Sequence, residues 1–81
     1  DYANRRMPFR HLHLEKIRDA QARGELRLAG ALNEPPDGAL LVFRSESPKV
    51  AEDFAENDPY VLNGLITSWR VRPWSVVAGE V

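Results

Sequence analysis

The chain has 81 residues, which is room for one domain with a modest hydrophobic core. Its 11 Lys and Arg residues balance 12 Asp and Glu residues, so it lacks the basic excess that is typical of nucleic-acid-binding proteins. Hydrophobic residues make up 43% and charged residues 28%, proportions that exclude a disordered or fibrous chain. We therefore predict a single folded domain over residues 1–81 that binds no nucleic acid.

The chain contains no cysteine, which excludes disulfide frameworks, thiolate zinc sites and cysteine nucleophiles. This composition is compatible with a reducing cytoplasm, which is the localisation that we predict. The longest apolar run, Ala39–Phe43, is too short to cross a bilayer, and the first residues lack the charged-then-apolar pattern of a signal peptide. No association with a membrane is expected.

The first half of the chain predicts a helix followed by a β-hairpin. Pro8 suits the first turn of a helix, apolar residues then recur at helical spacing from Phe9 to Arg23, and Gly24 follows as a stop. Leu26, Leu28, Gly30 and Leu32 alternate with Arg27, Ala29 and Ala31, a period of two that indicates a strand with one strongly apolar face. Turn residues fill 33–38, and the arm 39–45 is apolar on both faces, as in a strand covered on both sides.

The second half predicts a short helix, one further helical turn and a long strand. Ser47 and Pro48 are typical of a helix start, and the apolar stripe that follows consists of Val50, Ala51, Phe54 and Ala55. Asp58 and Pro59 repeat the pattern for a turn that ends at Asn63 and Gly64. Apolar and aromatic residues over Leu65–Val77 indicate a strand, which Pro73 restricts to a sheet edge or a bulge.

The resulting order is helix, strand, strand, helix, strand. This is the ferredoxin-like βαββαβ pattern of an α+β fold with its first strand missing from the sequence. Of two explanations, a strand upstream of residue 1 or a strand contributed by another chain, we favour the first.

Four motifs lie in a fixed order along these elements, and through them the chain resembles the YciI-like family from about Arg10 to Trp74. They are Arg-x-x-His at Arg10 and His13, Gly24 followed by Leu-Ala-Gly at 28–30, Asp-Pro-Tyr at 58–60 with Gly64 after it, and Arg-Pro-Trp at 72–74. Two features depart from the family, namely the absent first strand and the pair Ala31-Leu32 where proline is common.

The resemblance implies a ferredoxin-like subunit whose sheet packs against that of a second copy, giving a homodimeric α+β barrel. It also implies a cleft with a catalytic His and Asp, which are His13 and Asp58 in this sequence. The resemblance implies that this pair works without a metal or other cofactor. Related barrels, similar to muconolactone isomerase and to dehalogenases, act on small ring compounds. The resemblance thus favours a lyase-, isomerase- or dehalogenase-type enzyme for a small cyclic or carbonyl-containing substrate.

His13 lies four residues after Phe9 and four before Ile17, so its ring is expected to point toward the sheet. Histidine exchanges protons near neutral pH, which suits general acid–base catalysis when a carboxylate orients the ring. The alternative is a core histidine bonded to a backbone carbonyl, which periodicity alone favours. His11 falls off the apolar face and is expected at the surface, and the two histidines cannot share a metal.

The other candidate residues also have two interpretations each. Asp58 is a typical helix cap before proline, and it is also the predicted partner of His13. Arg10, one turn before His13, is either a substrate-binding guanidinium or a surface residue. Tyr60, with Trp69 and Trp74, would line a pocket for a ring substrate or serve the core or the dimer interface.

Two hypotheses for function follow from this sequence. In the first, His13 and Asp58 form the acid–base pair of a cofactor-independent enzyme. In the second, the protein is a non-catalytic module for small-ligand binding or assembly, and His13 is a structural residue.

Overall fold

A long helix, α1 (Tyr2–Ala22), opens the computed structural model, which describes residues 2–81 and their side chains from residue 4 onward. The predicted start near Pro8 was wrong, since Pro8 lies inside α1. A proline there removes one helical hydrogen bond, but the preceding residues include Arg5, Arg6 and Met7, which are strong helix formers. Propensity over this segment therefore outweighs the proline.

The end of α1 confirms the predicted glycine stop. Gly24 has a φ of +80°, a left-handed conformation that glycine adopts without steric cost. The Gly24 N–H donates to the Gln21 carbonyl (2.9 Å), and the Glu25 N–H donates to the Ala20 carbonyl (3.1 Å). This is the Schellman arrangement, and it turns the chain directly into the first strand.

The predicted hairpin is confirmed as β1 (Leu26–Leu32) and β2 (Gly38–Phe43), which pair antiparallel. A bulge between Leu26 and Leu28 interrupts the regular alternation of β1. As a result Leu26 is buried against the helices, whereas Leu28 and Leu32 lie on the opposite face with about half of their surface exposed. The sequence alternation predicted that these three leucines share one face of the strand. That prediction was wrong for Leu26, because the bulge turns it to the other face.

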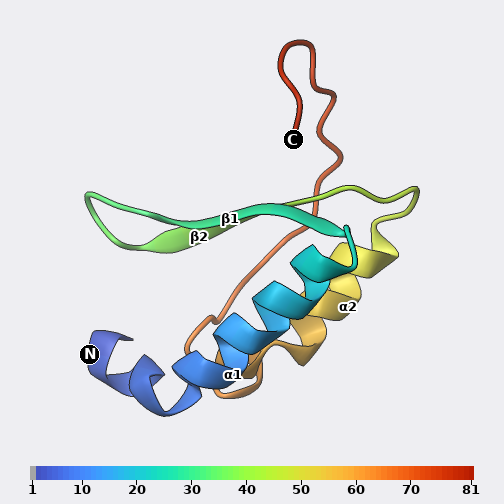
Figure 1. Cartoon of the computed structure of the whole chain (residues 1–81). Helices are drawn as coiled ribbons and strands as arrows, with labels where there is room; N and C mark the ends of the chain where they lie inside the picture. Colours follow the sequence, from blue (N-terminus) through green and yellow to red (C-terminus); the bar gives the residue numbers. More distant parts are fainter. Residues whose placement is uncertain (1) are drawn as a thin grey trace.

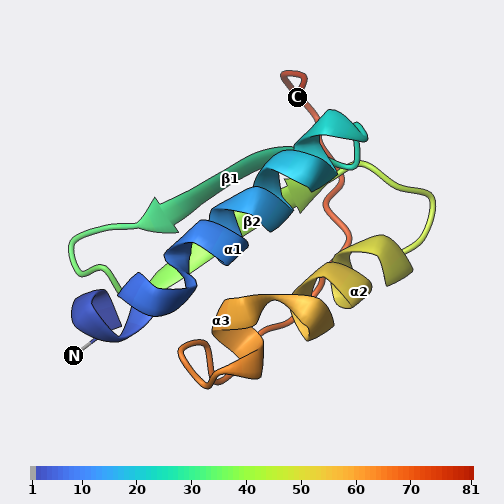
Figure 2. The same cartoon turned by 60° about the horizontal axis from the view of Figure 1, so that its bottom comes forward.

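The hydrophobic core lies between α1, the hairpin and a short helix, α2 (Lys49–Asn57). Its buried members are Ala20, Leu26 and Phe54, and the partly buried residues packed around them are Ile17, Leu41 and Phe43. Figures 1 and 2 show α1 and α2 on the same side of the hairpin, with the opposite side of the sheet uncovered by helices.

The two short helices follow the predicted pattern. The N-cap of α2 is Pro48 and not Ser47 as predicted, and the Ser47 hydroxyl accepts a hydrogen bond from the N–H of Lys49, the first residue of α2 (3.0 Å). A single turn, α3 (Pro59–Leu62), has Asp58 as its N-cap and Asn63 as its C-cap. Gly64 follows with a φ of +73°.

The strand predicted over Leu65–Val77 is absent, and this prediction was wrong. Residues 67–81 form no regular secondary structure, and the sheet of the described residues consists of β1 and β2 alone. A strand needs a neighbour to satisfy its backbone N–H and C=O groups, and in a split βαβ arrangement the neighbour of the last strand is the first. Figure 1 shows the C-terminal segment passing the hairpin and ending on the side away from α1.

The described chain is thus a small α+β domain with a long helix, a two-stranded antiparallel hairpin and short helices. None of the helices in residues 2–81 combines the length and the apolar character that crossing a membrane requires.

Candidate functional site

The candidate site forms where α1 meets the turn before α3. His13 lies in the middle of α1 on the face that also carries Ile17, which packs against the core. Its side chain is 15% exposed, and its Nδ1 lies 2.8 Å from Oδ1 of Asp58, a residue 45 positions later in the chain. The predicted contact between the two side chains is present, and it is largely shielded from water.

Asp58 is held in place by the start of α3. Its Oδ1 accepts a hydrogen bond from the Tyr60 N–H (3.1 Å), which makes Asp58 the N-cap of this turn, and the side chain is 6% exposed. The same oxygen contacts His13. Both interpretations of Asp58 therefore hold at once, because one carboxylate oxygen has two lone pairs and caps the helix while it contacts the imidazole.

Tyr60 completes the contacts of His13. The two rings stack with centroids 3.8 Å apart and planes 9° from parallel, and Tyr60 is 3% exposed. An offset or parallel stack of this kind adds to the stability of the pair beyond simple burial. Tyr60 therefore covers one face of the imidazole.

The remaining candidate residues lie outside this cluster. Arg10 is exposed and makes no hydrogen bond or ion pair with a side chain in the described part of the chain. His11 is exposed, as predicted, and its Nε2 lies 3.4 Å from Glu15. Trp69 and Trp74 are also exposed, on the segment that forms no strand.

The contacts of His13 fix which nitrogen carries the proton. An ionised carboxylate can only accept hydrogen bonds, so His13 Nδ1–H donates to Asp58 and the neutral ring keeps its lone pair on Nε2. Within residues 2–81 Nε2 makes no hydrogen bond. The arrangement can accept a proton at Nε2, and the Asp58 carboxylate would stabilise the imidazolium that forms.

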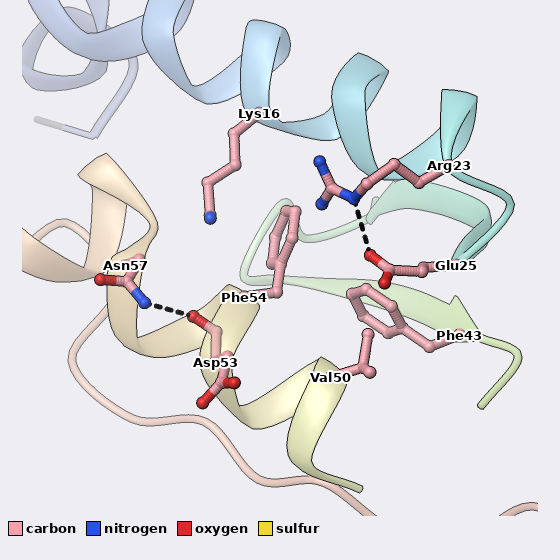
Figure 3. Close-up of a pocket in the computed structure, with 8 residues that line it drawn as sticks. All are labelled: Lys16, Arg23, Glu25, Phe43, Val50, Asp53, Phe54 and Asn57. Carbon is pink, nitrogen blue, oxygen red and sulfur yellow. Dashed lines mark hydrogen bonds and ion pairs between the residues drawn. The ribbon is translucent and has the colours of Figure 1, made fainter. Parts of the chain in front are cut away.

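A groove of about 310 Å³ lies elsewhere, between the second half of α1, α2 and the end of β2 (Figure 3). Figure 3 shows Phe54 and Phe43 facing into it. The Lys16 ammonium lies 4.8 Å from the centre of the Phe54 ring. Neither His13 nor Asp58 lines this groove. Sequence reasoning did not single it out, because no motif links Lys16 on one helix to Phe54 on another.

Comparison with known proteins bears on the fold more than on the chemistry. A family model described as the YCII-related domain matches residues 2–75, which is most of the chain. Comparison with curated proteins and with solved structures gives no significant match. Because the family model covers the helix, the hairpin and the turn that carries Asp58, the chain belongs to the family of YCII-related domains.

Proposed function

We propose that the protein is a cofactor-independent acid–base enzyme in which His13 moves a proton on a small cyclic or carbonyl-containing substrate. The observation that carries this proposal is the 2.8 Å contact between His13 Nδ1 and Asp58 Oδ1 in a largely buried setting. A carboxylate in this position holds the imidazole in one tautomer and leaves the other nitrogen to act as the base.

The proposed step is the removal of a proton from carbon beside a carbonyl group. Nε2 of His13 takes the proton, the C–H electron pair moves into the substrate to form an enolate, and the ring becomes an imidazolium beside Asp58. Return of that proton to another atom of the substrate completes an isomerisation. Loss of a β-substituent as an anion, followed by release of the proton from His13 to solvent, completes a lyase or dehalogenase reaction. We assign to Arg10 the binding of an anionic oxygen of the substrate, since it lies one helical turn before His13.

We further propose that the working unit is a homodimer in the cytoplasm. The face of the hairpin turned away from the helices carries Leu28, Leu32 and Leu40, each of which is at least half exposed. Burying such a face against the same face of a second copy is a common, self-complementary way to form a dimer. A chain without cysteine needs no disulfide to fold, which fits a reducing compartment.

The proposal is tested by proton exchange in D2O with a panel of small cyclic ketones, lactones and 3-halo ketones. We expect the wild-type protein to replace α-hydrogen by deuterium, seen by NMR as loss of the α-proton signal, in at least one of these compounds. His13→Gln should slow this exchange by about 100-fold or more, the usual contribution of a general base. His11→Gln is the matched control, because it removes the exposed histidine. Exchange at the same rate in the wild type and His13→Gln would contradict the proposal.

A non-catalytic module is the second candidate function. It is favoured by the groove in Figure 3, which lies apart from His13 and could hold a ligand without any acid–base group from the candidate site. In that case Phe54→Ala would weaken ligand binding, whereas His13→Gln would change thermal stability alone.

A further inference from the structure

The contact between Tyr60 and His13 carries an inference beyond the acid–base pair. We propose that Tyr60 is a positioning residue, whose ring keeps the imidazole in the one plane where Nδ1–H points at Asp58 and Nε2 points away from it. Its consequence for catalysis depends on the proposed function, whereas its effect on the ring does not.

The geometry of the stack restricts the rotation of the imidazole. The rings lie 3.8 Å apart and within 9° of parallel, so rotation of the His13 ring about its Cβ–Cγ bond would drive its edge into the Tyr60 ring. Rotation matters because a half-turn exchanges Nδ1 with a ring carbon and breaks the hydrogen bond to Asp58. The stacked Tyr60 ring therefore keeps the imidazole in the plane that the Asp58 contact requires and hinders the half-turn that would break this contact.

Tyr60 can restrain His13 because its own backbone is fixed on both sides. Its N–H donates to Asp58 Oδ1 (3.1 Å). Its carbonyl accepts from the N–H groups of Leu65 (2.8 Å) and Ile66 (3.0 Å), where the chain leaves α3. Pro59, between Asp58 and Tyr60, has a fixed φ and adds to this rigidity.

A single turn thus makes two different contacts with one imidazole. Asp58 contacts the edge of the ring at Nδ1, and Tyr60 covers its face. The sequence Asp58-Pro59-Tyr60 therefore works as one unit that sets both the tautomer and the plane of His13. The sequence predicted that Tyr60 lines a pocket for a substrate. In this proposal Tyr60 instead acts through its contact with His13.

The test measures the tautomer of His13 by ¹⁵N-detected NMR in Tyr60→Phe and Tyr60→Leu. The chain has 2 histidines, and the exposed His11 provides an internal reference in each spectrum. We expect Tyr60→Phe, which keeps a ring face, to retain the Nδ1–H tautomer. Tyr60→Leu should lower the ratio of Nδ1–H to Nε2–H by about 2- to 13-fold, the range to which the energies of aromatic pairs convert.

Phe54→Leu is the matched control for loss of stability. Phe54 is also a buried aromatic residue, but it packs edge-on against Phe43, with ring centres 5.3 Å apart, instead of against His13. The Phe54→Leu substitution should lower the melting temperature and leave the tautomer ratio of His13 unchanged. An unchanged ratio in folded Tyr60→Leu, or an equal change in Phe54→Leu, would overturn the inference.

A second measurement decides the matter if Tyr60→Leu does not fold. In the wild type and in Tyr60→Phe the stacked ring should shift the carbon-bound protons of His13 upfield of those of His11 by its ring current. Absence of this shift in both proteins would overturn the inference. These NMR results can be told apart from the result of the exchange assay. A protein that shows the stack of Tyr60 on His13 but catalyses no proton exchange would refute the proposed function and leave the positioning role of Tyr60 intact.

Discussion

His13 combines two properties that a general base requires, and each comes from a different neighbour. Asp58 accepts from Nδ1 and so leaves the lone pair on Nε2, and Tyr60 holds the plane of the ring. With its side chain 15% exposed, His13 keeps limited contact with solvent.

Substitutions of Asp58 separate its two roles. Asp58→Asn should keep the cap of α3, because asparagine is as good an N-cap as aspartate, but it removes the negative charge beside His13. Asp58→Ala removes both the cap of α3 and the negative charge beside His13. We expect Asp58→Ala to unfold with about 1 kcal/mol less free energy than Asp58→Asn, measured by urea denaturation.

Both variants should lack the proton exchange that the proposed function expects of the wild type. Equal stability of Asp58→Asn and Asp58→Ala would mean that the cap contributes nothing to the fold. Full activity in Asp58→Asn would mean that His13 needs no carboxylate.

The candidate site could be predicted in part from the sequence. Helical spacing predicted that the His13 ring points toward the sheet, whereas it contacts Asp58 and Tyr60 at the start of α3. The Asp-Pro pair marked Asp58 as a cap, and only the resemblance to a family linked His13 to Asp58. The stack of Tyr60 on His13 could not be predicted, because it depends on how α3 lies against α1. No local pattern encodes the relative position of two helices that are far apart in sequence.

Local contacts define where the helices that carry this site end and start. α1 ends at the Schellman arrangement around Gly24, and Asp58 caps the start of α3. The contact between His13 and Asp58 then joins the two helices, so a shift of one relative to the other would break it. The end of α1 also sets where β1 starts, and thereby places Leu26 in the core.

Gly24 and Gly30 offer a matched pair of substitutions at this scale. A Cβ added at either residue would meet no atom within 4 Å, but only Gly24 has a positive φ, of +80°. Gly24→Ala should therefore destabilise the protein by about 1 kcal/mol through backbone strain alone, a fall of roughly 4–8 °C in Tm.

Gly30→Ala should leave Tm unchanged or raise it slightly, since alanine in a strand restricts the unfolded chain more than glycine does. Both Tm values are measured by circular dichroism. Equal effects of the two substitutions would contradict the strain assigned to Gly24.

Local sequence patterns predicted most elements, and they failed where an element depends on its surroundings. Gly24 and Asp58 act on their nearest neighbours, and their predicted roles are confirmed. Ser47 accepts a hydrogen bond from Lys49, but the N-cap of α2 is Pro48. The strand predicted over Leu65–Val77 required a neighbouring strand, which the described residues do not provide. The bulge in β1 likewise follows from the packing of Leu26 and not from the alternation of leucines.

At the scale of the whole molecule, helices cover the hairpin on one side and not on the other (Figures 1 and 2). The side without helices exposes Leu28, Leu32 and Leu40. A two-stranded hairpin alone is marginally stable in water, so this open face would gain from a further layer. The proposed dimer would supply that layer.

Leu40 and Leu62 provide the test of this dimer. Leu40 is 56% exposed on the open face, and Leu62 is 67% exposed on α3, away from the sheet. The mass in solution is measured by size-exclusion chromatography with light scattering. We expect the wild type and Leu62→Lys to have twice the mass of one chain. Leu40→Lys should have the mass of one chain, because a lysine cannot be buried without a partner at the dimer interface. A monomeric wild type would contradict the dimer.

The most direct test of the acid–base account is the location of the proton on His13, observed in a ¹H–¹⁵N correlation spectrum at a pH where the ring is neutral. The account predicts a proton bound to Nδ1, a signal that is lost in Asp58→Ala and kept in Arg10→Ala, with no proton on Nε2. A proton on Nε2 in the wild-type protein would contradict it, because His13 would then have no free lone pair facing a substrate.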